Sequence, residues 1–293
     1  MAYFFQKSNS FAFFFAFSWY SMLFPVAPVR PGPNKKRWKG CPVFMSQRWL
    51  MIADAHLTCI EPEDGFFRML DAAARLPGDV GVIFLGDVFD LWIALRGYEN
   101  AEHRRFLDWC RGEKMKRKII FLEGNHEFFV AKTYADAFTY AGEDAYREGD
   151  LLWLHGDRIN KEDRAYAFLR FILRNRLTRR LLKLAGPTFG PSFAHYVRER
   201  LRTTNQAHKR YFPEPQALRF LASCPSGSVV FAGHFHDRVT KTADGRILEV
   251  LPAYASASEI AYYDPAAPEL AVFPADRIAG VCCKPMNQEA AES

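Results

Sequence analysis

The sequence predicts an α/β fold with a helical insertion between two of its strands. Short apolar runs bounded by Gly, Asp or Pro are typical of buried strands, and helical patterns lie between them. Strands that alternate with helices favour an α/β core. One strongly basic segment interrupts this alternation. With 293 residues and 33.7 kDa, the chain is long enough for one large domain or two modest ones.

The predicted elements follow one another regularly from residue 48 onwards. Helices are expected at 63–75 and 101–113. A compact domain over residues 45–275 would hold these elements, followed by a tail over 276–293. The expected strands are 49–53, 80–85, 119–122, 151–154, 229–232 and 247–251.

Residues 158–211 form the basic insertion, directly after the fourth strand. They hold 14 Lys or Arg against 3 Asp or Glu, a net charge of +11, in a chain of net charge +6. Leucines recur every four residues from Leu169 to Leu181, with arginines elsewhere on the turn, which predicts an amphipathic helix over 167–184. A second helix is expected from 192 to 210. We interpret the pair as a cap that meets an anionic ligand or surface.

Residues 1–44 form an N-terminal extension whose nature the sequence leaves open. The stretch 11–24 is apolar apart from two serines, and it is too short to span a bilayer comfortably. It resembles the core of a signal peptide or an anchor. Alternatively, the start is misassigned and the domain begins at Met45. The six cysteines lack a CxxC spacing, which indicates reduced thiols of a cytosolic protein.

Five short polar motifs follow predicted strands, where open α/β sheets place their sites. Residues i and i+2 of an extended chain point to the same side, so the side chains of Asp54 and His56 converge. Each motif alone is a weak signal, but five of the eight histidines fall in these motifs. The motifs are Asp54-Ala55-His56, Gly86-Asp87, Gly124-Asn125-His126-Glu127, His155-Gly156-Asp157 and Gly233-His234-Phe235-His236.

The donors in these motifs predict a metal centre. Carboxylate, amide and imidazole together suit Mn²⁺, Fe or Zn²⁺ better than Mg²⁺ alone. Two ions roughly 3.5–4 Å apart need a bridging carboxylate and about three further ligands each. The remaining histidines, His103, His195 and His208, are expected to be exposed or to cap helices. Seven candidate ligands meet the required count: Asp54, His56, Asp87, Asn125, His155, His234 and His236.

In this order, the motifs resemble those of the calcineurin-like metallophosphoesterases over residues 49–260. The resemblance implies a four-layer α/β/β/α sandwich of two mixed sheets with a helical cap insertion. It also implies a hydrolase of phosphoester or pyrophosphate bonds, in which His126 faces the scissile phosphate as a general acid or transition-state donor. One divalent ion would be held by Asp54, His56 and His236, a second by Asn125, His155 and His234, and Asp87 would bridge both.

Within that superfamily, residues 84–92 (FLGDVFDLW) and the cap are similar to the UDP-2,3-diacylglucosamine hydrolases of lipid A biosynthesis. This resemblance implies hydrolysis of the substrate pyrophosphate to UMP and 2,3-diacylglucosamine 1-phosphate, most simply with two Mn²⁺ ions. The best-known members carry Arg where this chain has His126, and Ser-Asp-Leu-His where it reads Ala53-Asp54-Ala55-His56. Expected substrate-binding residues are Asp163, Tyr166, Arg170, Asn205 and Lys209.

The expected partners follow from the cap. An acylated nucleotide sugar needs apolar and cationic contacts, and the same surface suits an anionic leaflet, so we expect a cytoplasmic protein peripheral to the inner face of the inner membrane. No nucleic acid partner is expected, because the basic residues share helices with apolar stripes. A genuine signal peptide would instead take the protein out of the cytosol and exclude a cytosolic substrate. The oligomeric state stays open.

Two other functions fit parts of the sequence. The first is a phosphodiesterase or phosphatase that acts on another phosphoester. The second is a non-catalytic scaffold that keeps the fold and has lost its metals. The scaffold is disfavoured, because none of the seven candidate ligands is missing.

Overall fold

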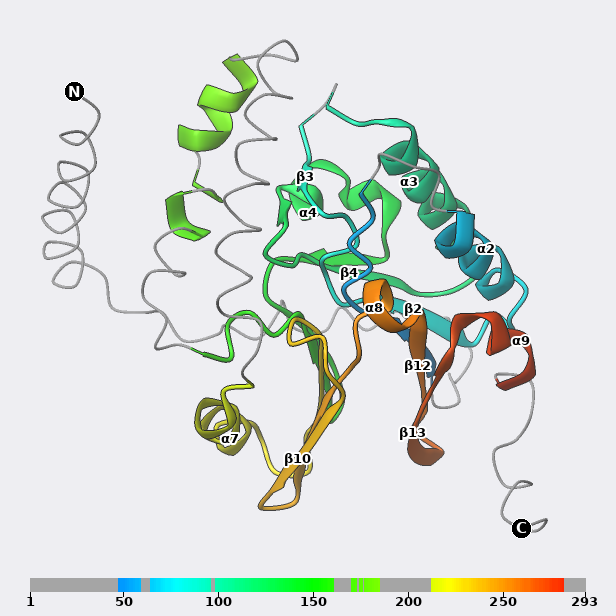
Figure 1. Cartoon of the computed structure of the whole chain (residues 1–293), viewed down its shortest axis with the longest axis vertical. Coiled ribbons are helices and arrows are strands. Elements are labelled where there is room, and N and C mark those ends of the chain that lie inside the picture. The colour runs from blue at the N-terminus through cyan, green and yellow to red at the C-terminus, as the bar shows by residue number, and fades with distance from the viewer. Residues whose placement is uncertain are drawn as a thin grey trace, which may run out of the picture. The chain divides into compact units, whose positions relative to one another are not determined.

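Two mixed β-sheets form the core of the fold in a computed structural model (Figure 1). The structure describes residues 47–58, 64–95, 98–160, 170–172, 174–175, 177–184 and 212–281. The larger sheet has the order β13 (Ala267–Pro274), β12 (Glu259–Asp264), β1 (Arg48–Ile52), β2 (Val80–Phe84), β4 (Ile119–Leu122) and β6 (Tyr140–Gly142). The smaller sheet has the order β10 (Val239–Ala243), β11 (Arg246–Val250), β9 (Val229–Ala232), β8 (Leu151–Leu154) and β7 (Ala145–Glu148).

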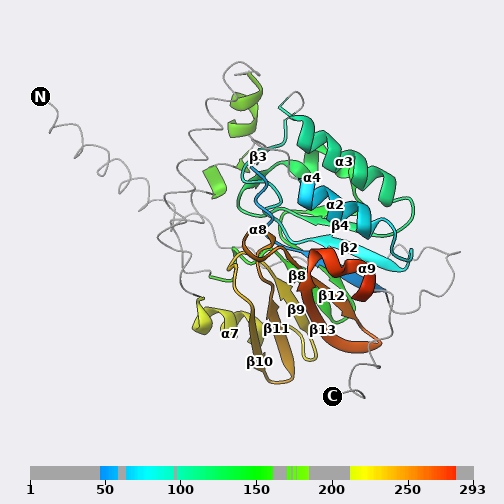
Figure 2. The same ribbon diagram turned by 45° about the vertical axis from the view of Figure 1, so that its right-hand side comes forward.

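Helices cover the outer face of each sheet (Figure 2). The larger sheet carries α2 (Asp64–Ala73), α3 (Ala101–Glu113) and α9 (Ile278–Val281), and the smaller sheet carries α7 (Glu214–Ala222). The layers therefore run helix, sheet, sheet, helix, which confirms the expected four-layer α/β/β/α sandwich. The short helices α4 (Val130–Thr133) and α8 (Tyr254–Ala257) and the two-stranded sheet of β3 (Trp92–Ile93) and β5 (Glu127–Phe128) lie in connections.

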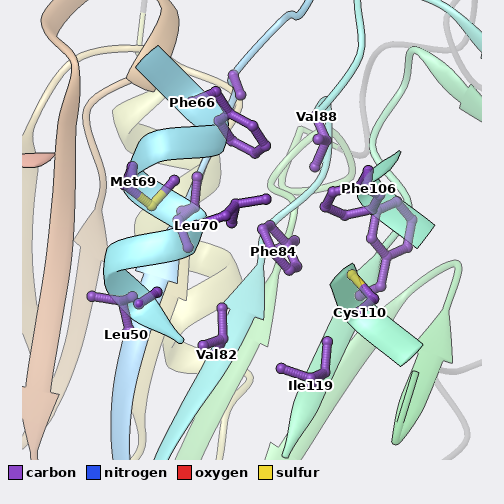
Figure 3. Close-up of a cluster of buried hydrophobic side chains, with 14 of the residues drawn as sticks. Leu50, Phe66, Met69, Leu70, Val82, Phe84, Val88, Phe106, Cys110 and Ile119 are labelled. Carbon is purple, nitrogen blue, oxygen red and sulfur yellow. The ribbon is translucent and has the colours of Figure 1, made fainter. Parts of the chain in front are cut away.

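Successive side chains of a strand point to opposite faces of the sheet, and this divides the core into two layers. Leu50 of β1 faces the helices, where it joins side chains of α2 and α3, while its neighbour Met51 faces the smaller sheet. Figure 3 shows the helix side of this arrangement, with Phe66 of α2 and Phe106 of α3 above the strands. Both faces of the larger sheet are thus covered, and this explains why its parallel strands read as continuous apolar runs.

The predicted strands and helices are confirmed at most positions. The strands expected at 119–122, 151–154 and 229–232 and the helix expected at 101–113 have the predicted bounds. The antiparallel pair β12 and β13 was not predicted, because Ala, Pro and Glu interrupt its apolar pattern. It continues the larger sheet beyond β1, and Ile278, just past the expected domain boundary, is buried in the core with α2.

His103 completes the N-terminus of α3. Its Nδ1 accepts a hydrogen bond from the backbone N–H of Asn100, while the Asn100 side chain accepts one from the His103 backbone, which is a capping box. The expected capping role is therefore confirmed. The imidazole itself is buried and stacks on Trp92 with ring centroids 4.8 Å apart. His195 and His208 lie outside the described residues.

Arg117 is a buried cation that ties together the segment between α2 and β2. Its Nε donates to Glu113 at 2.9 Å, and its Nη2 donates to the carbonyls of Leu76 at 2.9 Å and Ala74 at 3.2 Å. We expect Arg117→Met to lower the free energy of unfolding by about 3–5 kcal/mol, because it leaves the buried Glu113 carboxylate and these carbonyls without their donor.

Urea unfolding followed by circular dichroism would measure this loss. Arg111→Met is the matched control, since Arg111 makes its ion pairs with Asp108 and Asp136 at the surface. The control should change stability by no more than about 1 kcal/mol. Equal losses of unfolding free energy in the two variants would show that the burial of Arg117 does not contribute to stability.

The basic insertion is described at 158–160, 170–172, 174–175 and 177–184, between β8 and α7. The single helix expected over 167–184 is interrupted, because Asn175 is a bend whose side chain accepts from the backbone N–H of Thr178 at 2.8 Å. Asn175 thus caps a new helix over 177–184. The helix expected at 192–210 and the extension over 1–44 lie outside the described residues, and the bounds of the insertion stay a prediction.

The insertion contacts the core through a side of the helix that the leucine pattern did not predict. Leu182 is buried against Phe128 and Phe129, and Tyr98 donates from its hydroxyl to the Leu182 carbonyl at 2.9 Å. Leu177 and Leu181 of the predicted stripe are 65% and 57% exposed. None of the described helices has the length and apolar character needed to cross a membrane.

Candidate metal centre

The five motifs meet where strands from both sheets end. Asp54 and His56 follow β1, and Asp87 follows β2. Asn125 follows β4, in the loop that leads into β5. β1, β2 and β4 are neighbouring parallel strands, as are β8 and β9, so their carboxyl ends lie on one side of each sheet. The smaller sheet supplies His155 after β8, and His234 and His236 after β9.

The side chains form two groups that share a neighbour. In one, His56 Nε2 lies 3.3 Å from His236 Nε2, and His236 Nε2 lies 3.6 Å from Asp54 Oδ1. In the other, Asn125 Oδ1 lies 2.9 Å from His155 Nε2 and 3.0 Å from His234 Nδ1. Asp87 Oδ2 lies between them, 3.8 Å from His56 Nε2 and 3.6 Å from His155 Nε2.

These separations suit metal coordination. Neighbouring donors around an octahedral ion with bonds of about 2.1 Å are about 3.0 Å apart, and tetrahedral geometry widens this to about 3.4 Å. The donor atoms of Asp54, His56 and His236 fall within 4.8 Å of one another, as do those of Asp87, His155 and His234. A third such group joins His56, Asp87 and His126, so geometry alone also admits His126 as a ligand.

Backbone carbonyls set the orientation of two imidazoles. His155 Nδ1 lies 2.7 Å from the Leu85 carbonyl, and His126 Nδ1 lies 2.5 Å from the Asp90 carbonyl. A carbonyl can only accept, so Nδ1 carries a proton in both rings, and Nε2 is the nitrogen that faces the centre. Sequence patterns cannot reveal these partners, because any residue has a carbonyl. The Asp90 carboxylate lies 3.9 Å from His56 Nδ1, the ring nitrogen other than the one that faces His236.

The loops that carry the candidate ligands have strained backbones. Asp54, His56, Asp87, His234 and His236 have φ angles of 50°, 46°, 52°, 73° and 65°, in the left-handed region. This conformation costs a non-glycine residue about 1–3 kcal/mol, and it persists where the surroundings fix it, commonly at functional sites. Five of the eight such residues in the described chain belong to the seven candidate ligands. The strain therefore marks the same positions as the motifs do.

Two motif glycines are required because the loops approach each other closely. A Cβ on Gly124 would lie 2.1 Å from Asp87 Oδ1, and a Cβ on Gly233 would lie 2.5 Å from Asp54 Oδ2. Any side chain at either position would displace a candidate ligand. The glycine in the G-N and G-H motifs thus lets one loop pack directly on the carboxylate of the next.

The Glu127 side chain links the loop that follows β2 to the loop that follows β4. Its carboxylate accepts backbone hydrogen bonds from Asp87 at 3.0 Å, Val88 at 2.8 Å and Gly124 at 2.8 Å. Burial, and then the Asp87 charge, raises the pKa of Glu127 to about 8. Burial also acts to raise the pKa of Asp87, but the imidazoles of His126, His155 and His56 outweigh it and lower that pKa. Asp87 is therefore ionised and ready to bind cations.

The other predicted site residues have mixed outcomes. Asp157 of the His155-Gly156-Asp157 motif pairs with Arg170, whose other terminal nitrogen donates to the Glu143 carbonyl at 2.7 Å. Substrate binding by Arg170 stays a prediction, although the structure shows both terminal nitrogens bonded to protein. Asp163, Tyr166, Asn205 and Lys209 lie outside the described residues.

Protonation of His155 should weaken metal binding as the pH falls. Burial lowers the pKa of His155, but the Asp87 and Asp54 carboxylates outweigh it and raise that pKa above 6.5, whereas burial lowers the pKa of His234 to about 3. A metal competes with the proton for a ring nitrogen, so we expect the apparent Mn²⁺ affinity to fall about tenfold for each pH unit below the His155 pKa.

Calorimetric titration of the metal-free protein with Mn²⁺ between pH 8 and pH 5.5 would test this pH dependence. The expected fall should begin above pH 6.5, while His234 stays neutral throughout. An affinity that stays constant down to pH 5.5 would contradict the assignment of His155 as a metal ligand.

The fold and the strand-end motifs agree with comparison to known protein families. Residues 48–238 match the calcineurin-like phosphoesterase family, and the chain belongs to it. It is therefore a metal-dependent phosphoester hydrolase, with His and Asp groups able to hold a metal ion. The resemblance inferred from the motifs is confirmed.

Individual relatives narrow the family further. The chain is 30% identical over 205 residues to a UDP-2,3-diacylglucosamine hydrolase of Proteus mirabilis, covering 67% of this chain and 84% of the relative. It is 28% identical over 205 residues to the enzyme of the same name from Hamiltonella defensa, covering 64% and 76%. Among solved structures, an archaeal phosphodiesterase matches with a TM-score of 0.41 and 11% identity, covering 77% of this chain and 98% of that one.

Proposed function

We propose that the protein hydrolyses the pyrophosphate bond of UDP-2,3-diacylglucosamine, giving UMP and 2,3-diacylglucosamine 1-phosphate, with two divalent ions, most simply Mn²⁺. The observation that carries the proposal is the convergence of seven donors at one place with Asp87 between two groups. Relatives of that name from Proteus mirabilis and Hamiltonella defensa support the substrate.

Each group would hold one ion. Asp54, His56 and His236 would form the first site, which is more open because the His236 side chain is 24% exposed. Asn125, His155 and His234 would form the second, more deeply buried site, and Asp87 would serve both. When bound, the ions would supply Lewis-acid polarisation of the phosphoryl oxygens and acidify a water molecule near neutral pH.

His126 is the residue we assign to proton transfer. Its backbone N–H donates to Asp87 Oδ1 at 2.8 Å, and its Nδ1 donates to the Asp90 carbonyl, so both ends of the residue are fixed. Nε2 then faces the centre, 3.9 Å from Asp87 Oδ2. The protonated ring can donate from Nε2 to the phosphoryl oxygens or to the leaving group as charge develops there.

The basic insertion would hold the lipid part of the substrate and meet an anionic membrane surface. On the described helix, Leu177, Leu181 and Leu184 are 65%, 57% and 83% exposed, close to the basic residues Arg180 and Lys183. Exposed apolar side chains flanked by cations suit acyl chains and acidic head groups. This feature favours the lipid-linked substrate over a small water-soluble phosphoester.

The substrate assignment can be tested by comparing the turnover of two substrates. Purified protein with Mn²⁺ would be given UDP-2,3-diacylglucosamine or an aryl phosphodiester, and UMP or aryl alcohol would be quantified. We expect kcat/KM to be at least about a hundredfold higher for the lipid-linked nucleotide, because binding of its remote parts lowers the barrier. Turnover of the aryl phosphodiester alone would mean that the protein is a metallophosphoesterase with a different substrate.

A further inference from the structure

The side chain of Arg174, in the basic insertion, is buried, whereas Arg180 of the same insertion is exposed. Its side chain is 8% exposed and lies against Glu123, whose side chain is 0% exposed. Nη1 of Arg174 donates to Glu123 Oε2 at 2.6 Å. The other carboxylate oxygen of Glu123 accepts from the backbone N–H of Ala131 at 2.7 Å. The guanidinium is therefore held in one orientation at the base of the insertion.

The second terminal nitrogen of Arg174 contacts both ends of the loop that carries Asn125 and His126. Nη2 donates to the Gly124 carbonyl at 2.5 Å and to the Glu127 carbonyl at 2.8 Å. These two carbonyls lie immediately before and after the Asn125-His126 pair in the chain. One guanidinium group thus contacts both ends of the segment that supplies a candidate metal ligand and the candidate proton donor.

Two buried carboxylates hold backbone N–H groups of the same loop. The Glu127 carboxylate accepts from Gly124 N at 2.8 Å, and Asp87 Oδ1 accepts from His126 N at 2.8 Å. The loop is therefore held through its N–H groups by the Asp87 and Glu127 carboxylates and through its carbonyls by Arg174. Without Arg174, one of these two supports is lost, and the carbonyls of Gly124 and Glu127 keep no charged donor.

We propose that Arg174 is a positioning residue that sets the places of Asn125 and His126 and so links the insertion to the metal centre. The proposal rests on the proposed function only for its catalytic consequence. Charge-assisted bonds from a planar guanidinium fix direction as well as distance, and a lysine offers a single point charge. A displacement of about 1 Å at a reacting group can cost about a hundredfold in rate.

Direct binding of the substrate phosphates is the competing role for this arginine. Both terminal nitrogens already donate to protein groups, and the Glu123 carboxylate neutralises the charge. An anion that entered would have to displace Glu123 or leave it unpaired in a buried place. The contacts therefore favour positioning over substrate binding.

The test compares Arg174→Ala and Arg174→Lys with the wild type in the full-length protein, using an aryl phosphodiester that lacks nucleotide and lipid. We expect kcat to fall about 10- to 100-fold in both variants while KM changes less than about threefold. Mn²⁺ affinity, measured by calorimetry on the metal-free protein, should fall about tenfold. Added guanidinium ion should restore part of kcat to Arg174→Ala and none to Arg174→Lys, in which the longer side chain fills the space.

Arg111→Ala is the matched control, because it removes an arginine with two carboxylate partners at the surface, and it should leave all three quantities unchanged. A raised KM with unchanged kcat would overturn the proposal in favour of a substrate contact. A lowered Tm with unchanged kcat and Mn²⁺ affinity would overturn it in favour of a structural role. If the Arg174 variants do not fold, Glu123→Gln, which keeps the size of the partner, should reduce kcat and Mn²⁺ affinity in the same direction, and unchanged values would reject the proposal.

The metal titration also separates this proposal from the proposed function. If the wild type binds Mn²⁺ but hydrolyses neither UDP-2,3-diacylglucosamine nor the aryl phosphodiester, the proposed function fails. The difference in Mn²⁺ affinity between the wild type and Arg174→Ala then still decides whether Arg174 positions Asn125.

Discussion

Asp87→Ala is expected to remove bound metal and activity together. The Asp87 carboxylate lies near an imidazole of each group, with Oδ2 at 3.8 Å from His56 Nε2 and 3.6 Å from His155 Nε2. Each ion would lose a ligand, and the two positive charges would lose the anion between them. We expect turnover to fall by at least about a thousandfold, since the ions supply several kcal/mol of transition-state stabilisation.

Elemental analysis of the purified variant and an assay of Mn²⁺-dependent hydrolysis would measure both losses. Asp136→Ala is the control, because Asp136 pairs with Arg111 at the surface. A circular dichroism spectrum identical to that of the wild type would show that the variant is folded. Full Mn²⁺-dependent hydrolysis by Asp87→Ala would rule out a bridging role for this residue.

His126→Gln should separate catalysis from metal binding. The glutamine keeps the backbone N–H that donates to Asp87 Oδ1, so the loop stays in place. It cannot transfer a proton, and loss of general acid catalysis typically costs about 10²- to 10⁴-fold in kcat. We therefore expect a fall of that size with the metal content of the wild type.

The metal content of His126→Gln is the informative measurement, because geometry places His126 in a possible ligand group with His56 and Asp87. Loss of one metal equivalent, in step with activity, would make His126 a ligand. A kcat close to that of the wild type would leave proton transfer to another group. His56→Gln, which alters a candidate ligand in the same group, should lose metal and serves as the comparison.

Much of the layered core could be predicted from the sequence, because its signals are local. The runs at 119–122 and 229–232 are short, apolar and bounded by polar residues, and each has the predicted bounds. The motifs could be found for a related reason. A site at strand ends requires polar residues and glycines at abrupt transitions from apolar segments, as at Leu85-Gly86-Asp87.

The contacts that orient the site could not be predicted, because they join residues far apart in the chain or involve the backbone. The Leu85 carbonyl that orients His155 leaves no mark on the sequence. Arg174 looked like a solvent-facing cation of an amphipathic helix, and its pairing with Glu123 spans 51 positions. Beyond the interruption at Asn175, Leu182 is buried against the core, while Leu181 of the leucine pattern is exposed.

Anomalous X-ray scattering from crystals grown with Mn²⁺ would test the central claim most directly, namely that the five motifs build one dinuclear centre. The account predicts two Mn²⁺ peaks roughly 3.5–4 Å apart, with Asp87 in contact with both. Asp54, His56 and His236 should surround one peak, and Asn125, His155 and His234 the other. A single peak, or two peaks that do not share Asp87, would contradict the account.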